Sequence, residues 1–200
     1  MSTFINVQTN PSPIAAASTM DGIQLNNQAL QAERMGNLQE AERLHLRAIE
    51  IKEQGVGPNA VTTALSRNGL GELYLKMGRL DEAEVNLNKA LEVRKGAGPA
   101  FDAAVTRENL AQLYEVRGNM KAAKDMRLAG APNNIACGNY TCQGQSFSVD
   151  RLKVCGRCKS VYYCSQACQK SDWKARHKQY SAWRNTSTST ATTHAPEAIE

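Results

Sequence analysis

Apolar residues in the first two thirds of the chain recur with the spacing of amphipathic helices. Leu80, Ala83 and Leu87 lie at positions i, i+3 and i+7, and Ala90 and Leu91 continue the same stripe. A helix with about 3.6 residues per turn places such positions on one face, whereas a strand needs strict alternation. The pattern therefore predicts a chain built from helices that each bury one apolar face.

One eight-residue segment occurs three times among these helical stretches. Residues 35–42 read MGNLQEAE, residues 77–84 read MGRLDEAE, and residues 117–124 read RGNMKAAK. The glycine of the segment moves from position 36 to 78 and then to 118, which gives steps of 42 and 40 residues. Glycine readily takes the left-handed conformation that ends a helix. The repetition predicts three units, each consisting of a helix, a glycine turn and a second helix.

This arrangement resembles the tetratricopeptide repeat, whose motif places a small residue, an aromatic residue, a glycine and an alanine in fixed order. The usual period of that repeat is about 34 residues, and the longer spacing found here is similar to that of kinesin light chains. The resemblance implies an all-α helical-repeat fold of about three helix pairs over residues 23–129, with Tyr74 and Ala83 in the packing between helices. The matching residues are Gly71, Tyr74, Gly78, Ala83 and Ala90 in the second unit, Ala111, Tyr114, Gly118 and Ala123 in the third, and Ala29, Gly36, Ala41 and Ala48 in the first, which lacks the aromatic residue.

Basic charge and cysteine are concentrated in one later segment. Residues 1–136 carry 15 basic and 15 acidic side chains, whereas residues 137–185 carry 9 basic and 2 acidic ones, a net charge of +7. All six cysteines and both tryptophans lie in this basic segment. The amino terminus lacks the basic start and apolar block of a secretory signal, so the cysteines indicate metal or redox chemistry rather than disulfides. The chain is therefore expected to contain two modules.

The cysteines have the spacing of zinc ligands. They read C-x4-C, twelve residues, C-x2-C, five residues and C-x3-C, and His177 follows after eight more residues. Thiolates bind zinc tetrahedrally, and Cys155 and Cys158 stand in the kind of tight turn from which two ligands reach one ion. Cys164 and Cys168 are four residues apart, so one face of a helix would present both. Four ordered half-sites within fifty residues indicate a zinc-binding unit.

Two helices are expected around these ligands. The first begins near Ser165. The second is expected over residues 172–184, with Ser171 as its N-cap, because serine caps helix starts well. This second helix would carry Trp173, His177 and Ser181 on one stripe.

Residues 155–173, which read CGRCKSVYYCSQACQKSDW, resemble the central signature of the MYND zinc finger. The resemblance implies a finger over residues 137–181 with a cross-braced pair of zinc ions. The family has a cysteine at the last ligand position, where this chain has Ser181, so one or two Zn²⁺ ions are expected. Three strong ligands and an open position also describe a catalytic zinc, so a weakened structural site and a catalytic site both stay open. The implied ligands are Cys137, Cys142, Cys164 and Cys168 in the first site and Cys155, Cys158 and His177, with Ser181 as a doubtful eighth ligand, in the second.

The remaining segments define the expected limits of the modules. Residues 1–22 and 185–200 are rich in Ser, Thr, Pro and small residues, which predicts disorder. A linker is expected over residues 130–136, and the last helix of the finger is expected to continue to about residue 184. No apolar run approaches the roughly 18 residues of a membrane helix, so the chain is expected to stay inside the cell without a membrane, in the cytoplasm, the nucleus or both.

The two modules together predict a non-catalytic adaptor that binds other proteins, with transcriptional regulation as one setting. Stacked repeat helices form a concave groove lined by the first helix of each pair. The resemblance to MYND fingers implies a shallow groove for proline-containing peptides. Partners are therefore expected to be proteins with extended or proline-containing segments. The expected peptide-binding residues are Asn27, Arg67, Asn68, Arg107 and Asn109 in the repeats, with both arginines exposed, and Gln169 and Trp173 in the finger.

Other interpretations compete with the adaptor. The groove residues would look the same in sequence on a merely solvated face, and Trp173 would look the same as a core residue over the second zinc. MYND fingers also occur beside SET domains in lysine methyltransferases, so the chain is alternatively a remnant that lacks that catalytic domain. The basic segment could instead contact nucleic-acid phosphates. Direct nucleic-acid binding is not favoured, because the ββα pattern of major-groove fingers is missing.

Overall fold

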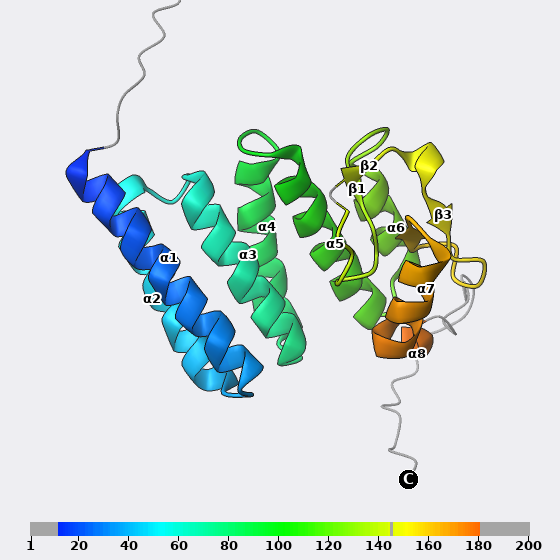
Figure 1. Cartoon of the computed structure of the whole chain (residues 1–200), viewed down its shortest axis with the longest axis horizontal. Coiled ribbons are helices and arrows are strands. Elements are labelled where there is room, and N and C mark those ends of the chain that lie inside the picture. Colours follow the sequence, from blue (N-terminus) through cyan, green and yellow to red (C-terminus); the bar gives the residue numbers. More distant parts are fainter. Residues whose placement is uncertain (1–11, 145, 181–200) are drawn as a thin grey trace, which may run out of the picture.

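The structure is a computed structural model that describes residues 12–144 and 146–180 (Figure 1). Six helices stand side by side in chain order, and a small cysteine-rich unit follows at the far end of the stack. Their bounds are α1 Pro13–Arg34, α2 Leu38–Val56, α3 Val61–Lys76, α4 Leu80–Arg94, α5 Ala100–Val116 and α6 Met120–Leu128.

Each predicted glycine turn joins two neighbouring helices. Gly36, Gly78 and Gly118 have φ angles of 78°, 73° and 75°, in the left-handed region that favours glycine. The side chains of Asn37 and Asn119 then cap α2 and α6 by accepting a backbone N–H of the first turn. Within each unit the two helices pack on one another, α1 on α2, α3 on α4 and α5 on α6. The prediction of three helix pairs is confirmed.

Small and medium apolar side chains form a continuous core along the repeats. Tyr74 is 5% exposed and Ala83 is fully buried, which confirms their expected packing roles. The Tyr74 hydroxyl donates to Glu42 Oε1 at 2.9 Å, so this ring also joins the second unit to the first. The small alanines let the helix axes approach closely. The core residues are Ala29, Ala32, Ala41, Leu44, Ile49, Leu70, Leu73, Tyr74, Ala83, Leu87, Leu110 and Leu113.

The predicted disorder of residues 1–22 is wrong for the described part of that segment. The first helix begins at Pro13, and the Ser12 side chain accepts a backbone N–H of its first turn. Proline suits the first helical position because its missing N–H would have no partner in the helix there. Gly22 packs against the stem of Lys52, where a Cβ would come within 2.4 Å of the lysine Cε. Capping and close contact with α2 therefore order this helix, and the other residues predicted to be disordered lie outside the described residues.

A buried cation at the end of α2 and of α4 contacts the start of the next helix pair. Lys52 donates to Ser66 Oγ at 2.8 Å and to a carbonyl of the first turn of α3. Arg94 donates to Thr106 Oγ1 at 2.7 Å and to a carbonyl of the first turn of α5. These contacts occupy corresponding positions in successive units. The sequence did not reveal them, because a cation near a helix end is usually exposed to solvent.

The cysteine-rich unit contains two short antiparallel strand pairs. One pair joins β1 (Ile135–Ala136) to β2 (Ser146–Phe147), with Ile135 opposite Phe147. The other joins β3 (Lys153–Val154) to β4 (Tyr162–Tyr163). A single 3-10 turn, η1 (Val149–Arg151), connects the two pairs. These strands are too short to hold a fold by themselves, so the unit depends on other contacts.

A continuous helical segment ends the described chain. It begins with α7 (Gln166–Asp172), at the start near Ser165 that the sequence predicts, and the Ser165 side chain caps it by accepting a backbone N–H. The predicted helix start at Ser171 is wrong, because that residue lies inside α7 and the backbone stays helical beyond it. The segment continues through a π-helical turn, η2 (Trp173–His177), into α8 (Lys178–Tyr180). The part of the predicted helix after residue 180 lies outside the described residues.

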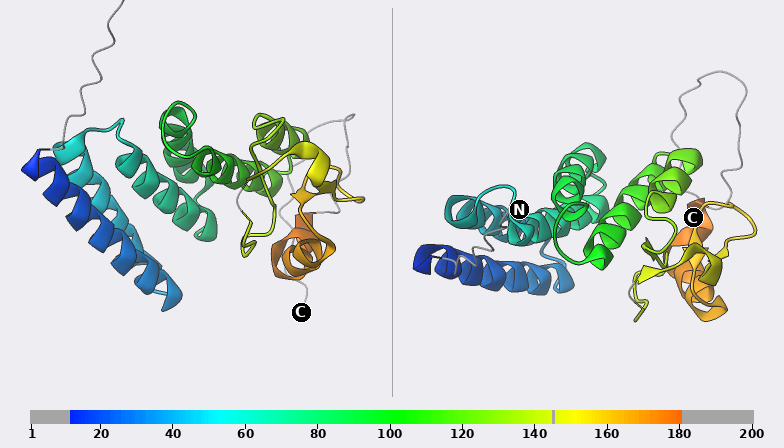
Figure 2. Two further views of the ribbon diagram at one scale, coloured as in Figure 1. Left: turned by 45° about the horizontal axis from the view of Figure 1, so that its top comes forward. Right: turned by 90° about the horizontal axis from the view of Figure 1, so that it is seen from above.

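The cysteine-rich unit packs directly on the last helix pair. Residues 130–136, the expected linker, contain β1, which contacts both α5 and α6. Ile135 is 1% exposed and forms a small core with Leu152 and Tyr162, and Leu128 of α6 packs against it. Both views in Figure 2 show the unit next to these two helices. The expected linker is thus part of a core that the last repeat and the cysteine-rich unit share.

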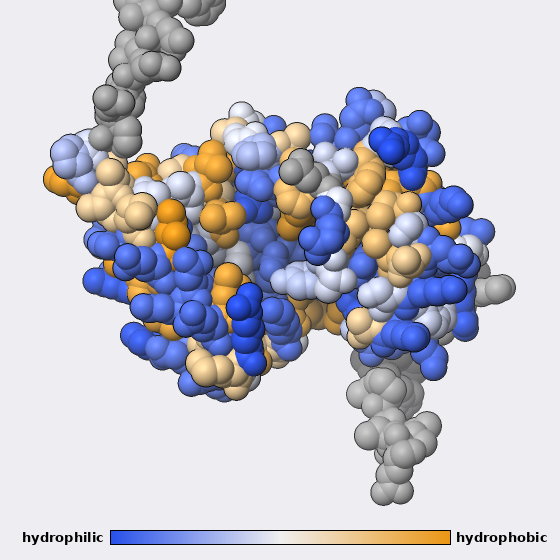
Figure 3. All heavy atoms as spheres, in the orientation of Figure 1, coloured by the Kyte–Doolittle hydropathy of each residue, from blue (hydrophilic) through white to orange (hydrophobic). Residues whose placement is uncertain are grey.

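None of the helices among the described residues is long and apolar enough to cross a membrane. On the face shown in Figure 3, hydrophilic side chains separate small apolar patches over both the repeats and the cysteine-rich unit. The apolar residues of the helices are instead collected between the helix pairs.

Candidate metal centre

Four cysteines from separate segments meet in the cysteine-rich unit. The Sγ atoms of Cys137, Cys142, Cys164 and Cys168 all lie within 4.8 Å of one another. The Sγ atom of Cys164 lies 3.6 Å from that of Cys142 and 3.5 Å from that of Cys168. Four sulfurs placed about 2.3 Å from one zinc ion stand about 3.8 Å apart in a tetrahedron. The first cluster therefore has the dimensions of a zinc site with four thiolates.

The surroundings of these thiols set their protonation. Burial raises the pKa of Cys137 and of Cys142. Burial acts in the same direction on Cys168, but hydrogen bonds with Asn139 and Ser165 outweigh it and lower the pKa of this thiol to about 7. Metal ions bind the thiolate form. A zinc ion must therefore displace protons from the buried thiols, so its affinity should fall as the pH falls.

A second cluster joins the turn between β3 and β4 to the π-helical turn. The ligand atoms of Cys155, Cys158 and His177 lie within 4.8 Å of one another, and Cys158 Sγ lies 3.3 Å from His177 Nε2. Burial lowers the pKa of His177, which favours the neutral imidazole that binds metals. Ser181 lies outside the described residues, so the weaker second zinc that it implies stays a prediction.

Helix geometry and aromatic contacts fix the position of His177. The N–H of Lys178 bonds to the carbonyl of Trp173, one residue further back than in an α-helix. The rings of Trp173 and Tyr163 meet the imidazole edge-on, with centroid distances of 5.8 Å and 6.3 Å. The Tyr163 hydroxyl in turn donates to Asp172 Oδ2 at 2.7 Å. The imidazole is therefore held between two rings, one of which is itself held by a buried carboxylate.

A network of buried charges ties this helix to the repeats. Glu115 of α5 is fully buried and pairs with Arg176 of η2 and, at 2.8 Å, with Arg127 of α6. Arg127 also donates two hydrogen bonds to Glu108, at 2.7 Å and 2.8 Å. Arg176 reaches Asp172 at 3.1 Å. Burial alone would raise the pKa of Glu115, but the two guanidinium groups hold it below its usual value. Buried ion pairs thus join the cysteine-rich unit to the last repeat.

Sequence reasoning missed this network. A weak signal was present, because Glu108 and Glu115 are seven residues apart and so share one face of α5. The partner that completes the network, Arg176, is 61 residues from Glu115. Spacing along the chain therefore could not show that the acidic face of α5 is covered by the metal-binding unit.

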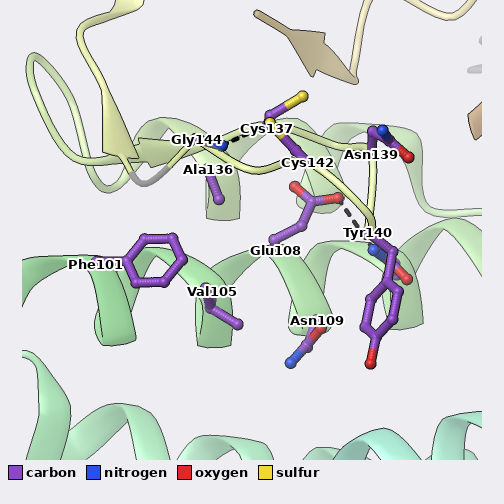
Figure 4. Close-up of a pocket in the computed structure, with 11 residues that line it drawn as sticks. Phe101, Val105, Glu108, Asn109, Ala136, Cys137, Asn139, Tyr140, Cys142 and Gly144 are labelled. Atoms are coloured by element: carbon purple, nitrogen blue, oxygen red, sulfur yellow. Dashed lines mark hydrogen bonds between the residues drawn. The ribbon is translucent and has the colours of Figure 1, made fainter. Parts of the chain in front are cut away.

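The loop that carries Cys137 and Cys142 lies over α5. Figure 4 shows these cysteines and Gly144 above Phe101 and Val105, with a small cavity of about 100 Å³ between loop and helix. The Gly144 N–H donates to Cys142 Sγ at 3.4 Å. The first cluster is therefore also placed against the last repeat.

The expected groove residues of the repeats fall into two groups. Asn27 is exposed, whereas the Arg67 side chain is only 15% exposed and pairs with Glu53, so the prediction that Arg67 is exposed is wrong. Asn68, Arg107 and Asn109 are buried, with exposed fractions of 6%, 9% and 4%. The prediction that Arg107 is exposed is wrong, because its side chain turns away from solvent and donates to a backbone carbonyl just before β1 at 2.9 Å. The five residues do not form one exposed surface.

The two buried asparagines connect α3 to α5. Asn68 Nδ2 and Asn109 Nδ2 both donate to Glu72 Oε1 at 2.7 Å. Asn68 Oδ1 also accepts from the Thr106 hydroxyl at 2.9 Å. These amides already have partners inside the fold, so a peptide would have to displace them. Their part in peptide binding stays a prediction.

The expected peptide-binding residues of the cysteine-rich unit line one groove. Gln169 and Trp173 lie four residues apart on the same helical segment and border an open groove of about 440 Å³. The guanidinium carbon of Arg157 lies 5.9 Å from the centre of the Trp173 ring. Lys170 and Lys174 also line the groove. The surface combines an aromatic side chain with three cations.

Comparisons with known proteins agree with both parts of the fold. The tetratricopeptide repeat family matches residues 23–96, and the MYND finger family matches residues 136–180. The crystal structure of BtubC (BKLC) from P. vanneervenii has a similar fold, with a TM-score of 0.53 and 24% identity over 57% of this chain and 48% of that chain. These matches define a helical-repeat protein with a zinc finger. In particular, the chain is a tetratricopeptide-repeat protein that carries a MYND finger, and both domain types serve protein–protein interaction.

Two curated relatives match only short segments. Ubiquitin carboxyl-terminal hydrolase 19 of Arabidopsis thaliana is 73% identical over 26 residues, which are 13% of this chain and 4% of that protein. Histone-lysine N-methyltransferase ASHR1 of Arabidopsis thaliana is 39% identical over 51 residues, which are 26% of this chain and 10% of that protein. Because this chain covers at most a tenth of either relative, the activities in their names belong to those proteins.

The two clusters fit the zinc sites of a MYND finger, and one or two Zn²⁺ ions fit them. Four thiolates would hold the first ion, and two thiolates with an imidazole would hold the second. Each ion would cross-link segments that lie apart in the chain. Such cross-links supply folding free energy where little apolar surface is buried.

Proposed function

We propose that this protein is a non-catalytic adaptor that binds extended, proline-containing peptides in the groove beside Trp173. The groove of about 440 Å³ is the observation that carries the proposal. An indole ring packs well on proline rings, and the amide of Gln169 can donate to and accept from a peptide backbone. Zinc in the two adjoining clusters would keep these side chains in place, which lowers the ordering cost of binding.

The charges around the groove indicate which residues the bound peptide would carry. Arg157, Lys170 and Lys174 have no carboxylate partner among the described residues, and all three line the groove. Cations at the rim of an interface raise the association rate of acidic partners more than they raise affinity. The preferred peptides therefore carry an acidic residue next to the proline, and binding should weaken as salt rises.

The repeats supply a second surface in this proposal. Asn27 is exposed on the first helix pair, whereas Arg67 of the second pair would have to leave Glu53 to contact a partner. The repeats and the finger share a core through Ile135, so the two surfaces keep a fixed separation. A partner that contacts both would gain effective concentration for its second contact.

The alternatives receive less support. Arg176, one of the cations that would contact nucleic-acid phosphates, pairs with Glu115 and Asp172 instead. The similarity to the methyltransferase covers only 51 residues. We therefore favour the adaptor over a nucleic-acid regulator or a methyltransferase remnant.

Titration of the labelled, zinc-loaded protein with an acidic proline-containing peptide tests the proposal. We expect shifts of the Trp173 indole N–H and the Gln169 amide signals, and at least tenfold weaker binding in Trp173→Ala. Tyr140→Ala is a matched control, because it removes an aromatic side chain that is 68% exposed on another surface. Unchanged affinity in Trp173→Ala would refute the groove. Stronger binding of an oligonucleotide than of the peptide at physiological salt would favour the nucleic-acid alternative.

A further inference from the structure

A basic pocket lies outside the finger, where the second repeat meets the third. It has a volume of about 430 Å³ and lies between the α4–α5 loop, the start of α5 and the chain after α6. Its lining includes Arg94, Lys95 and Arg107 and contains no carboxylate among the described residues, although Lys95 pairs with Glu92 outside the lining at 2.7 Å. We call it the junction pocket. Its cations are distinct from those of the finger groove, and the sequence pattern did not bring them together.

Arg94 is a buried cation with unused donors. It is 3% exposed, and Nη1 donates to the Asp102 carbonyl at 3.2 Å and to Thr106 Oγ1 at 2.7 Å, its hydrogen bonds within the described part of the chain. Its buried Nε has no hydrogen-bond partner among the described residues. Burial lowers the pKa of Arg94, and the more distant carboxylates of Asp102 and Glu72 offset this only in part. A guanidinium group stays charged in proteins, so this charge is under-compensated.

Arg107 shows the same property. Its side chain is 9% exposed and donates from Nη2 to the Asn134 carbonyl at 2.9 Å. Its buried Nε also has no hydrogen-bond partner among the described residues. Burial lowers the pKa of Arg107 without any compensating carboxylate. Gly130 makes room for the guanidinium, because a Cβ there would come within 2.7 Å of Nη2.

We propose that the junction pocket binds a phosphate group. A buried charge without a counterion is unfavourable, and two guanidinium groups match the charge of about −1.5 to −2 that a phosphate monoester carries at neutral pH. A single carboxylate would balance only one of them. The planar donors of arginine also fit phosphate oxygens in pairs.

The backbone around the pocket suits the same ligand. The 17-residue helix α5 begins at Ala100, which lines the pocket. The first N–H groups of a helix and its positive end favour anions. Gly96, Ala97 and Gly98 also line the pocket, so this part of its wall has only small side chains. Arg107, which the sequence assigns to a peptide groove, thus acts together with Arg94 at a different place.

The test follows the Arg94 and Arg107 Nε–H signals of the labelled, zinc-loaded chain as inorganic phosphate is added at constant ionic strength. We expect saturable shifts of both signals and at least a tenfold rise of the dissociation constant in Arg107→Gln. Ala97→Glu should abolish binding, because it places a carboxylate at the rim while changing only an exposed side chain. Lys89→Gln is the matched control, since it removes one charge from an exposed position of α4.

Further ligands identify the source of the phosphate. Tighter binding of phosphoserine than of inorganic phosphate supports a phosphorylated side chain as the ligand, and the reverse order supports the free ion. Equal shifts with chloride or with acetate would overturn the proposal, as would full binding by Ala97→Glu. If Arg107→Gln does not fold, Ala97→Glu decides the question by itself, because it leaves both arginines in place.

Discussion

The repeats and the finger keep their structures by different means. In the repeats, side chains such as Ala83, Leu87 and Leu113 are fully buried in a continuous apolar core. In the finger, one small core combines Val161 and Tyr163 with the cysteines of both clusters. Burying a large apolar side chain contributes about 1.5–3 kcal/mol, whereas a structural zinc contributes about 10 kcal/mol or more to the folding of zinc-finger peptides. Metal binding would therefore stabilise the finger, whose short chain buries only a small apolar core.

The last helix pair belongs to both regions. Its helix α5 packs on α4, just as α3 packs on α2 of the pair before it. The last pair also shares the Ile135 core and the Glu115–Arg176 ion pair with the finger. Two modules with separate limits, as the sequence suggests, would unfold separately. The shared core and the buried charges instead couple α5 and α6 to the metal-binding unit.

Zinc removal should have the largest effect on this comparison. A chelator should unfold the finger, because its thiolates would repel one another and its apolar core is small. We also expect α5 and α6 to lose protection while α1 to α4 keep theirs. Hydrogen exchange measured by mass spectrometry can follow all three regions at once. Full protection of α5 and α6 in the metal-free protein would show that the shared core contributes little.

Arg127→Met should destabilise the finger and last repeat by about 3–5 kcal/mol, because it leaves buried Glu108 without its ion-pair partner and Glu115 with Arg176 alone. Glu108 and Glu115 would lose contacts at 2.7–2.8 Å. Urea unfolding followed by fluorescence measures the loss. Lys121→Met, at an 85% exposed position of the same helix, should cost less than about 0.5 kcal/mol. Similar costs for both variants would contradict a structural role of the buried network.

Ala83→Arg should destabilise the repeats by about 3 kcal/mol, because the fully buried site has room for neither the volume nor the charge of arginine. The finger should keep its zinc, since this residue lies in the second repeat. Circular dichroism during thermal unfolding, together with metal analysis, separates the two effects. Val85→Arg, at a 52% exposed site of the same helix, is the control. Equal melting temperatures of the two variants would place Ala83 outside the core.

Lys52 should give the smallest effect, which depends on pH. Burial lowers the pKa of Lys52 to about 8, below the value of about 10.4 in an unfolded chain. The unfolded state therefore binds more protons between these values, and this residue reduces stability as the pH falls from about 10.5 to about 8, by about 3 kcal/mol at most. Lys52→Met should remove this dependence of the free energy of unfolding on pH, and Lys89→Met, at an exposed site, should keep it. Urea unfolding at several pH values measures this dependence. If the free energy of unfolding changes equally with pH in wild type and in Lys52→Met, the lowered pKa of Lys52 is contradicted.

Local spacing predicted the features that depend on neighbours in the chain. The turns at Gly36, Gly78 and Gly118 follow from the repeated segment, and the burial of Tyr74 follows from the resemblance to the tetratricopeptide repeat. The two metal clusters follow from the resemblance to the MYND signature, and the structure brings those side chains together. A helix begins next to Ser165 as expected, and the contact that caps it is only three residues away in the chain.

Features that depend on distant contacts could not be predicted in this way. Arg94, Arg107 and Glu115 were not expected to be buried, because charged residues on helices are usually exposed. Their neighbours come from other helix pairs or from the finger. Ser171 illustrates the opposite error, since a good capping residue has no effect when the helix already continues through it.

The contact between the finger and α6 also limits the length of the repeat array. A helical array buries the apolar face of each unit against the next, so its last unit needs a polar cover. Here Ile135 of β1 and Tyr162 of the finger pack with Leu128, and Arg127 Nη1 donates to the Ser160 carbonyl at 3.3 Å. The MYND finger therefore covers the last helix pair and ends the array of helical repeats. Without zinc, the finger would no longer cover this end of the array, and Leu128 would lose its apolar neighbours.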